Sequence, residues 1–240
     1  MRILVLEDDR RLGRGIADRL RKDAYAVDLV VTLAEAQEAY RTYDYDLLIL
    51  DRKVPGGDGL ELAEEAREAG DQVPVLVLSG FGSSSDRIEG LMRGADDYLS
   101  KPVRLEELVL RVSKLLVRKA VESGGSLRVG RVCIDPERRQ AFIDEEPVKL
   151  SRTQFGVLEY LFLQGGRPVS AEELLEHVWD RNADPFSSAV PPLMTRLRAI
   201  FAGVLEFENV REVGYTAVPV EADDESTETH GSKGRDLFHE

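Results

Sequence analysis

The chain has 240 residues, of which 42% are hydrophobic and 32% are charged, and its formal net charge is −13. This length allows one large domain or two ordinary ones, and the composition is typical of a soluble globular protein. No apolar run is long enough to span a membrane, and the acidic residues after the short apolar start exclude a secretory signal. We therefore expect a cytoplasmic protein without membrane contact.

Cysteine content and charge distribution narrow the class further. Cys133 is the only cysteine, which excludes an internal disulfide and a cysteine-based zinc site and fits a reducing cytoplasm. The negative net charge argues against a protein that coats nucleic acid with its whole surface, but it leaves room for a local contact patch. The acidity is concentrated in residues 221–240, which have almost no apolar content and are predicted to be disordered.

The first 119 residues alternate short apolar runs with helical patterns. The apolar runs predict buried strands at 3–6, 25–31, 47–50, 73–79 and 98–100. The segments that follow them predict helices at 9–22, 33–42, 58–69, 84–93 and 103–118. This alternation predicts an α/β fold, a five-stranded parallel doubly wound sheet with helices on both faces.

The pattern changes after a predicted flexible linker at 120–126, which contains the sequence ESGGS. Short alternating strands are predicted at 127–130, 132–135, 139–144 and 146–150. A helix is predicted at 151–164, and Ser170 is a good N-cap for the next one. Residues 207–218 predict a β-hairpin, so the region 127–220 is expected to be a second, α+β domain.

Residues 187–201 predict an amphipathic helix even though Pro191 and Pro192 stand side by side near its start. Because proline lacks an N–H and clashes with the preceding turn, such a pair is tolerated only in the first turn of a helix. We therefore expect this helix to begin at Val190 or Pro191.

Charged residues stand at three predicted strand ends of the first region. Glu7, Asp8 and Asp9 follow the first strand, Asp51 ends the third, and Lys101 follows the fifth. With the strand order 2-1-3-4-5 these ends are neighbours, at the edge where doubly wound sheets bind ligands. Clustered carboxylates repel one another, so they favour a hard divalent cation with oxygen ligands, which suits Mg²⁺. Mg²⁺ beside a free carboxylate is the arrangement that phosphoryl transfer onto that carboxylate needs.

Four motifs of this region carry a family resemblance: VLEDD (5–9), LLILDRKVPGGDGLEL (47–62), VLVLSG (75–80) and GADDYLSKPV (94–103). In this combination and spacing they resemble the receiver domain of two-component response regulators. The resemblance implies that a sensor histidine kinase phosphorylates Asp51. It also implies a magnesium site with these ligands: Glu7, Asp8, Asp51 and the backbone carbonyl of Lys53.

The same resemblance implies roles for residues around the phosphorylated carboxylate. Ser79 would turn its hydroxyl to a phosphoryl oxygen, and the aromatic ring of Tyr98 would swing inward with it. Lys101 would pair with the phosphate. Pro55 and Gly59 resemble the turn after the phosphorylated strand, where close loop geometry needs them.

One departure from the receiver pattern is at Arg52 and Lys53, where apolar residues are commoner. Both side chains are expected to keep their charged ends in solvent, because long cationic side chains usually do. The alternative is that Lys53 reaches the acyl phosphate and changes its lifetime.

Opposite charges surround a small apolar centre on the predicted helices 84–93 and 103–118 and the strand between them. These charges could pair within one chain, at well under about 1 kcal/mol for each pair. In the OmpR/PhoB group, which these residues resemble, the same positions pair across a two-fold dimer. We therefore expect phosphorylation to favour a homodimer. The expected interface pairs Arg87 with Glu107, Asp97 with Arg111 and Asp96 with Arg118, around Ile88, Leu91 and Leu110.

The second region resembles the winged-helix effector domain of the same group, most strongly in LSRTQFGVL (150–158) and GGRPVSAEELLEHVW (165–179). The resemblance places the helix in 187–201 in the major groove of double-stranded DNA and the hairpin in the minor groove. Pro191 and Pro192 remove two N–H groups that could bind phosphate there. The residues that remain to contact DNA are Thr195, Arg196, Arg198 and Arg211.

Two functions follow from this reading. The first is a response regulator that dimerises through its receiver domain and regulates transcription by binding DNA. The alternative is a response regulator whose degenerate winged helix acts through a protein partner, for instance RNA polymerase. An enzyme acting on a small phosphorylated substrate would need a lid over the acidic pocket, and the sequence offers none, so we do not expect an enzyme.

The predicted domain organisation has four parts. They are a receiver domain (1–119), a flexible linker (120–126), a winged-helix domain (127–220) and an acidic disordered tail (221–240).

Overall fold

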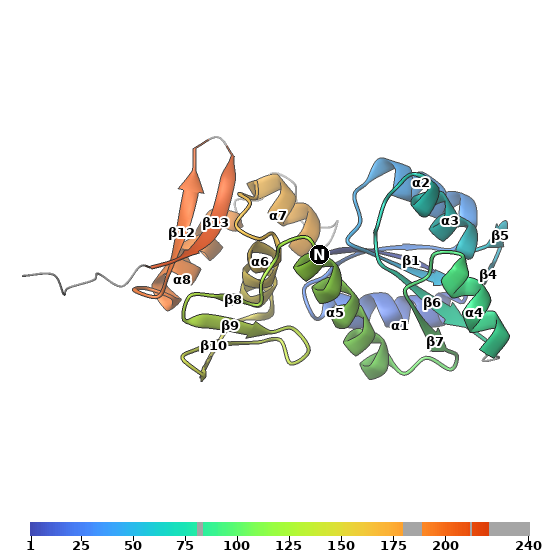
Figure 1. Cartoon of the computed structure of the whole chain (residues 1–240), viewed down its shortest axis with the longest axis horizontal. Coiled ribbons are helices and arrows are strands. Elements are labelled where there is room, and N and C mark those ends of the chain that lie inside the picture. Colours follow the sequence, from blue (N-terminus) through green and yellow to red (C-terminus); the bar gives the residue numbers. More distant parts are fainter. Residues whose placement is uncertain (81–83, 180–188, 212, 221–240) are drawn as a thin grey trace, which may run out of the picture.

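The computed structural model describes residues 1–80, 84–179, 189–211 and 213–220. These residues form an elongated molecule of two parts, with helix α5 running between them (Figure 1). The tail predicted at 221–240 lies outside the described residues, and so does the side chain of Arg87. Among the described helices, none combines the length and apolar character that a membrane span requires.

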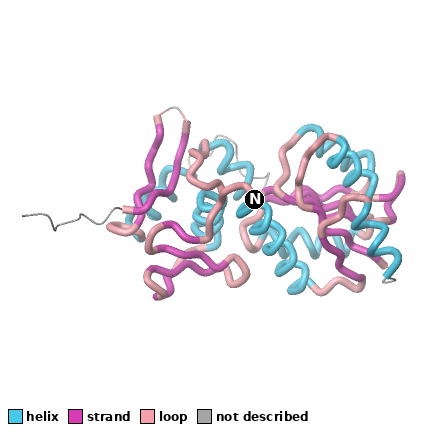
Figure 2. Tube along the Cα trace, in the orientation of Figure 1, coloured by secondary structure: helices cyan, strands magenta, loops and turns pink. Residues whose placement is uncertain are grey.

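A five-stranded parallel sheet forms the centre of the first part, in the order β2-β1-β3-β6-β7. This order confirms the predicted doubly wound topology, since β6 and β7 are its fourth and fifth parallel strands. Figure 2 shows the strands of this part lying between helices. Strands β1, β3 and β6 are buried throughout, as their continuous apolar runs predict. The bounds are β1 Arg2–Leu6, β2 Ala26–Val30, β3 Leu47–Asp51, β6 Val75–Ser79 and β7 Asp97–Ser100.

Helices cover both faces of this sheet. Side chains of α1 and α5 pack in the core on one face, and side chains of α2 and α3 pack on the other. Apolar residues at helical spacing make these faces, and Thr32 starts α2 with a capping box. The bounds are α1 Arg10–Arg21, α2 Leu33–Thr42, α3 Leu60–Glu68, α4 Ser84–Met92 and α5 Leu105–Glu122.

A two-stranded hairpin follows β3 and was not predicted from the sequence. Strand β4 (Lys53–Val54) pairs antiparallel with β5 (Gly57–Asp58). Helix α3 consequently begins at Leu60, two residues later than predicted, where the Asp58 carboxylate accepts a hydrogen bond of 3.0 Å from the Leu60 N–H. The hairpin places Asp58 close to α4, where it pairs with Arg93, the residue that follows this helix.

Helix α5 extends to Glu122, so the first residues of the linker predicted at 120–126 are helical. Lys119, Ala120 and Val121 are compatible with a helix, and the chain turns only at Gly124, which has a φ of 91°. The N–H of Ser126 then donates to the Phe162 carbonyl of the second part, at 3.1 Å. The non-helical connection between the two parts is therefore shorter than the predicted linker.

The second part is α+β, as predicted. Its four-stranded sheet has the order β11-β10-β9-β8, and a separate β-hairpin follows the last helix. Ser151 caps α6 with a capping box, and Ser170 accepts from the Glu173 N–H at the start of α7. The strands are β8 Arg128–Val129, β9 Val132–Asp135, β10 Gln140–Ile143, β11 Glu146–Val148, β12 Leu205–Val210 and β13 Gly214–Pro219; the helices are α6 Arg152–Leu163, α7 Ala171–Val178 and α8 Val190–Ile200.

Helix α8 begins at Val190, so Pro191 and Pro192 both lie in its first turn, as predicted. Neither proline leaves a helical hydrogen bond unmade, because the first N–H groups of a helix have no partner within it. Val190, Met194 and Leu197 are buried on the core side.

The two parts contact each other beside the start of β1. In α7, the His177 ring nitrogen Nδ1 lies 2.5 Å from a carboxylate oxygen of Asp46, which precedes β3. Arg139, from the turn between β9 and β10, lies over the Tyr25 ring at 5.0 Å from its centroid and pairs with Glu159 of α6 at 3.1 Å. The His177–Asp46 pair and the Arg139–Tyr25 cation–π contact thus join the two parts, and Glu159 holds Arg139 in place from within the second part.

Candidate functional site

The acidic residues predicted to meet at one end of the sheet do so. Glu7 comes directly after β1, and Asp51 is the last residue of β3. Glu7 is fully buried and Asp51 is 6% exposed, while Asp8 is exposed. The carboxylates of these three residues offer oxygen atoms that all lie within 4.8 Å of one another.

Lys101, which follows β7, provides the positive charge of the site. Its Nζ lies 2.6 Å from Asp51 and 2.8 Å from Glu7. Burial alone would lower the pKa of Lys101, but its hydrogen bonds to Asp51 and Glu7 raise it, so the ammonium is the stable form. Burial raises the pKa of the Glu7 carboxyl, because the buried carboxylate loses its hydration. The hydrogen bond from Lys101 acts in the opposite direction and stabilises the charged form.

Tight backbone geometry holds the loop after Asp51. A Cβ on Gly59 would lie 2.1 Å from the Asp51 carbonyl oxygen, so only glycine fits. The Gly59 N–H donates to the Arg52 carbonyl at 3.1 Å, which closes the loop around the hairpin. This confirms the prediction that Gly59 is needed for close loop geometry.

A cavity of about 620 Å³ opens beside Asp51. The buried Ser79, at the end of β6, is one of the residues that line it. The complete lining is Asp51, Arg52, Lys53, Gly57, Asp58, Ser79, Gly80, Glu89 and Lys101. The cavity therefore combines a carboxylate, an ammonium and a hydroxyl, the groups that the sequence analysis assigned to it.

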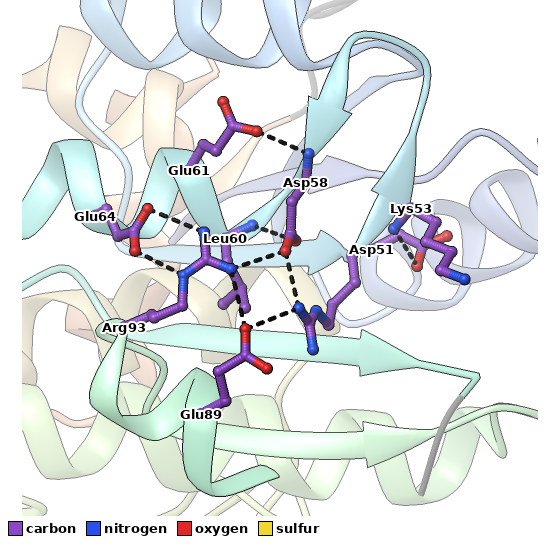
Figure 3. A network of polar contacts seen from close by, with 9 residues as sticks. Asp51, Lys53, Asp58, Leu60, Glu61, Glu64, Glu89 and Arg93 are labelled. Carbon is purple, nitrogen blue, oxygen red and sulfur yellow. Dashed lines mark hydrogen bonds and ion pairs between the residues drawn. The ribbon is translucent and has the colours of Figure 1, made fainter. Parts of the chain in front are cut away.

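The prediction that Arg52 keeps its charged end in solvent is wrong. Its side chain is 20% exposed, and it pairs with Asp58 at 2.9 Å and with Glu89 of α4 at 3.4 Å. The unpredicted hairpin causes this, because it brings Asp58 within reach. Lys53 is exposed, as predicted, and its backbone N–H lies 3.4 Å from the Asp51 carboxylate (Figure 3).

Tyr98 of β7 lies inside the domain, with 5% of its surface exposed. Its hydroxyl reaches beneath α4 at Gly90, where an added Cβ would lie 1.1 Å from the Tyr98 Oη. The predicted switch residue therefore occupies an inward position that depends on a glycine in α4.

The predicted dimer residues form a surface with an exposed apolar centre. Ile88, Leu91 and Leu110 are 59%, 50% and 41% exposed. The charged residues pair within the chain: Arg111 with Asp97 at 2.6 Å and with Glu107 at 2.7 Å, and Arg118 with Asp96. Positively and negatively charged side chains thus share one patch, and they form ion pairs with each other within the chain.

The predicted DNA-contact residues differ in their availability. All four are exposed, but the side chains of Thr195 and Arg198 are engaged within the chain. The Thr195 hydroxyl donates to the Pro191 carbonyl at 3.0 Å, within its own helix. The Arg198 guanidinium donates to the Phe207 carbonyl of β12 at 2.7 and 3.1 Å, so it fixes the hairpin to α8.

The fold and the acidic site define a receiver domain joined to a transcriptional effector domain, and comparison with known proteins agrees. Residues 3–113 match the family "response regulator receiver domain", and residues 145–217 match "transcriptional regulatory protein, C terminal". The chain belongs to the OmpR/PhoB family of two-component response regulators, which are transcription regulators.

Three curated relatives illustrate this membership. The transcriptional regulatory protein CutR of Streptomyces coelicolor is 42% identical over 82% of this chain and 91% of its own length. The two-component response regulator PhoP of Pseudomonas aeruginosa is 34% identical over 90% of this chain and 97% of its own. The transcriptional regulatory protein QseB of Escherichia coli O157:H7 is 36% identical over 90% of this chain and 98% of its own length. These matches span both domains, which favours DNA binding over the protein-partner alternative.

The sequence analysis did not predict a group of charged residues next to Asp51. Asp58, Glu89 and Arg93 form ion pairs with Arg52 or with each other beside the cavity. The one available signal was the cationic residue directly after Asp51, where an apolar residue is commoner.

Proposed function

We propose that this cytoplasmic protein accepts a phosphoryl group on Asp51 from a sensor histidine kinase and thereby controls its binding to DNA. The observation that carries the proposal is the position of the Asp51 carboxylate. It lies at a cavity, 2.6 Å from the Lys101 ammonium and beside the carboxylates of Glu7 and Asp8. The phosphoacceptor belongs to a receiver domain of residues 1–119, and the output to a winged-helix domain of residues 127–220.

In the transfer step, an Asp51 oxygen attacks the phosphorus of the kinase phosphohistidine. The new O–P bond forms as the P–N bond breaks, and the imidazole, which carries a proton on its other ring nitrogen, leaves as the neutral ring with the electron pair of that bond. Lys101 stays protonated and offsets the charge of the acyl phosphate. The Ser79 hydroxyl, buried at the end of β6, is placed to donate to a phosphoryl oxygen.

The acidic cluster fits Mg²⁺. It offers carboxylate oxygen from Glu7, Asp8 and Asp51, and one of these residues is exposed, which leaves room for coordinated water. The backbone carbonyl of Lys53 is the fourth proposed ligand. When bound, the ion neutralises charge on the phosphoryl oxygens during transfer.

Phosphorylation is proposed to act through a homodimer. The apolar side chains of Ile88 and Leu91 on α4 and of Leu110 on α5 are exposed, and a second copy would bury them. The intrachain partners Asp97 and Arg111 could exchange for the same residues of the second copy, because a two-fold interface places each beside the other's counterpart.

DNA contact is proposed to use α8 and the β12–β13 hairpin. Arg196 and Arg211 are exposed on this surface and would bind phosphate groups. Thr195 is also exposed on α8 and contributes a hydroxyl. Arg198 acts on the geometry of the surface, since it holds the hairpin against the helix through the Phe207 carbonyl.

The direct test is phosphorylation of the full chain with acetyl phosphate and Mg²⁺, read by intact-mass and peptide mass spectrometry. One phosphoryl group should appear on the peptide that contains Asp51, and chelating Mg²⁺ should abolish the reaction. Asp51→Asn should remain unmodified, while Asp44→Asn, which changes an exposed carboxylate of the same domain, should react like the parent. Equal labelling of Asp51→Asn would contradict the proposal.

A further inference from the structure

A ring of four ion-paired side chains lies between the phosphoacceptor loop and α4. Arg52 pairs with Asp58 at 2.9 Å and with Glu89 at 3.4 Å. Arg93 pairs with the same two carboxylates, at 2.9 Å and 3.5 Å. Each arginine therefore bridges both acids, and each acid bridges both arginines (Figure 3).

The ring connects elements that are otherwise separate. Arg52 is the residue next to the phosphoacceptor, Asp58 belongs to the hairpin, and Glu89 is in α4. Arg93, which follows α4, adds a two-pronged pair with Glu64 of α3, at 2.6 and 3.0 Å. Planar arginine–carboxylate pairs of this kind fix direction as well as distance, so α4 is held toward the hairpin and α3.

Tyr98 lies against α4, the helix that contains Glu89. Its hydroxyl touches the backbone of α4 at Gly90, which is the residue after Glu89. Burial raises the pKa of Tyr98, and charges of the ring, including Arg52, Asp58 and Glu89, act on its phenol as well. The inward side chain of Tyr98 therefore meets α4 at Gly90, and the four ion-paired residues lie near enough for their charges to act on its phenol.

We propose that the ring of Arg52, Asp58, Glu89 and Arg93 positions α4 so that Gly90 covers the inward Tyr98. Arg52 is then a positioning residue that couples the phosphoacceptor strand to α4. The contacts that hold Tyr98 inward come from the protein itself, so they act whether or not Asp51 carries a phosphoryl group. Because α4 also carries Ile88 and Leu91, the ring sets how readily the proposed dimer surface forms. This inference rests on the proposed function, whose regulation it specifies.

The experiment uses ¹⁹F NMR of the full chain labelled with 3-fluorotyrosine. The Tyr98 signal is assigned by its loss in Tyr98→Phe, and its shift between H₂O and D₂O measures exposure to solvent. Spectra are recorded with and without beryllofluoride and Mg²⁺, which together mimic the phosphoryl group. The variants are Arg52→Gln, Arg93→Gln and Gly90→Ala, and the matched control is Arg41→Gln, which breaks an exposed ion pair with Glu65 in the same domain.

Arg52→Gln and Arg93→Gln should each lower the ratio of buried to exposed Tyr98 by about fivefold without beryllofluoride, as expected for a strong partly exposed pair. Beryllofluoride should restore most of the buried population. Gly90→Ala should keep Tyr98 exposed under both conditions, since the added methyl occupies the position of its hydroxyl. Arg41→Gln should match the parent.

The inference is overturned if both arginine variants keep the Tyr98 signal of the parent, or if Gly90→Ala leaves Tyr98 buried. In either case beryllofluoride-dependent dimerisation of the parent, measured by sedimentation, would show that the proposed function still stands. Failure of the proposed function looks different. In that case beryllofluoride would change neither the dimerisation of the parent nor the Tyr98 signal of the arginine variants.

Discussion

Replacing Lys101 with methionine should strengthen Mg²⁺ binding at the acidic cluster. The Lys101 ammonium lies 2.6 Å from Asp51 and 2.8 Å from Glu7, so it competes with a divalent cation for the same carboxylates. Methionine removes the charge and keeps most of the side-chain volume. A unit charge about 5 Å from a divalent ion costs about 1.5 kcal/mol even at the dielectric constant of water, so the affinity should rise about tenfold.

The same substitution should destabilise the chain when Mg²⁺ is absent. The buried carboxylates of Glu7 and Asp51 come within 4.8 Å of each other, and their repulsion is about 3 kcal/mol at an effective dielectric constant near 20. Urea denaturation across a Mg²⁺ series measures both effects, with Lys22→Met, an exposed site of the same domain, as the control. Unchanged or weaker Mg²⁺ binding by Lys101→Met would refute the view that ammonium and metal share these oxygens.

Three further predictions concern stability. Burial alone would raise the pKa of Asp46, but its ion pair across the domain interface and nearby N–H groups lower it to about 2. Asp46→Asn should therefore lower the free energy of unfolding by about 2 kcal/mol near pH 5, and the difference from the parent should shrink as pH falls from about 4 toward 2; a pH-independent difference would contradict this. Arg139→Met leaves Glu159, 2% exposed, without its partner and should cost about 3–5 kcal/mol in urea denaturation, most of it regained when Glu159→Leu is added; no recovery in the double variant would count against a charge effect. Gly59→Ala should cost about 1–3 kcal/mol and slow phosphorylation, whereas Gly15→Ala, with open space around its Cβ, should do neither.

The elements that the sequence predicted well are those with a periodic or positional signal. Continuous apolar runs predict the buried strands, and the rule that parallel strands bring their carboxyl ends to one edge predicts that Glu7, Asp51 and Lys101 meet there. The start of α8 at Val190 followed from the missing N–H groups of two prolines.

Features that depend on contacts between distant segments were not predictable in this way. Arg52 turns to Asp58 and Glu89 because a two-stranded hairpin brings one acid and α4 brings the other, and neither placement leaves a periodic pattern. The pairing of Asp46 with His177 likewise joins two domains whose docking no local signal encodes. The position of Arg198 in α8 predicts a DNA contact, and the hydrogen bond of its guanidinium to the Phe207 carbonyl, at 2.7 Å, leaves no such signal in the sequence.

The charge pattern of the predicted dimer surface is compatible with two kinds of pairing. The sequence placed Asp97 and Arg111 on the same patch, which the structure bears out. Opposite charges on one patch satisfy themselves within a chain as readily as across a two-fold axis, so the pattern alone does not choose between the two. Sedimentation with and without beryllofluoride makes that choice.

The central claim is that modification of Asp51 controls DNA binding by the second domain. The most direct measurement is the affinity of the full chain for DNA selected from a random-sequence pool, across a salt series, with and without beryllofluoride and Mg²⁺. The account predicts tighter binding with beryllofluoride, no response in Asp51→Asn, and a smaller salt dependence in Arg196→Ala and Arg211→Ala. Selective DNA binding that ignores beryllofluoride, or the failure of any sequence to be selected while the receiver still responds to it, would contradict the account.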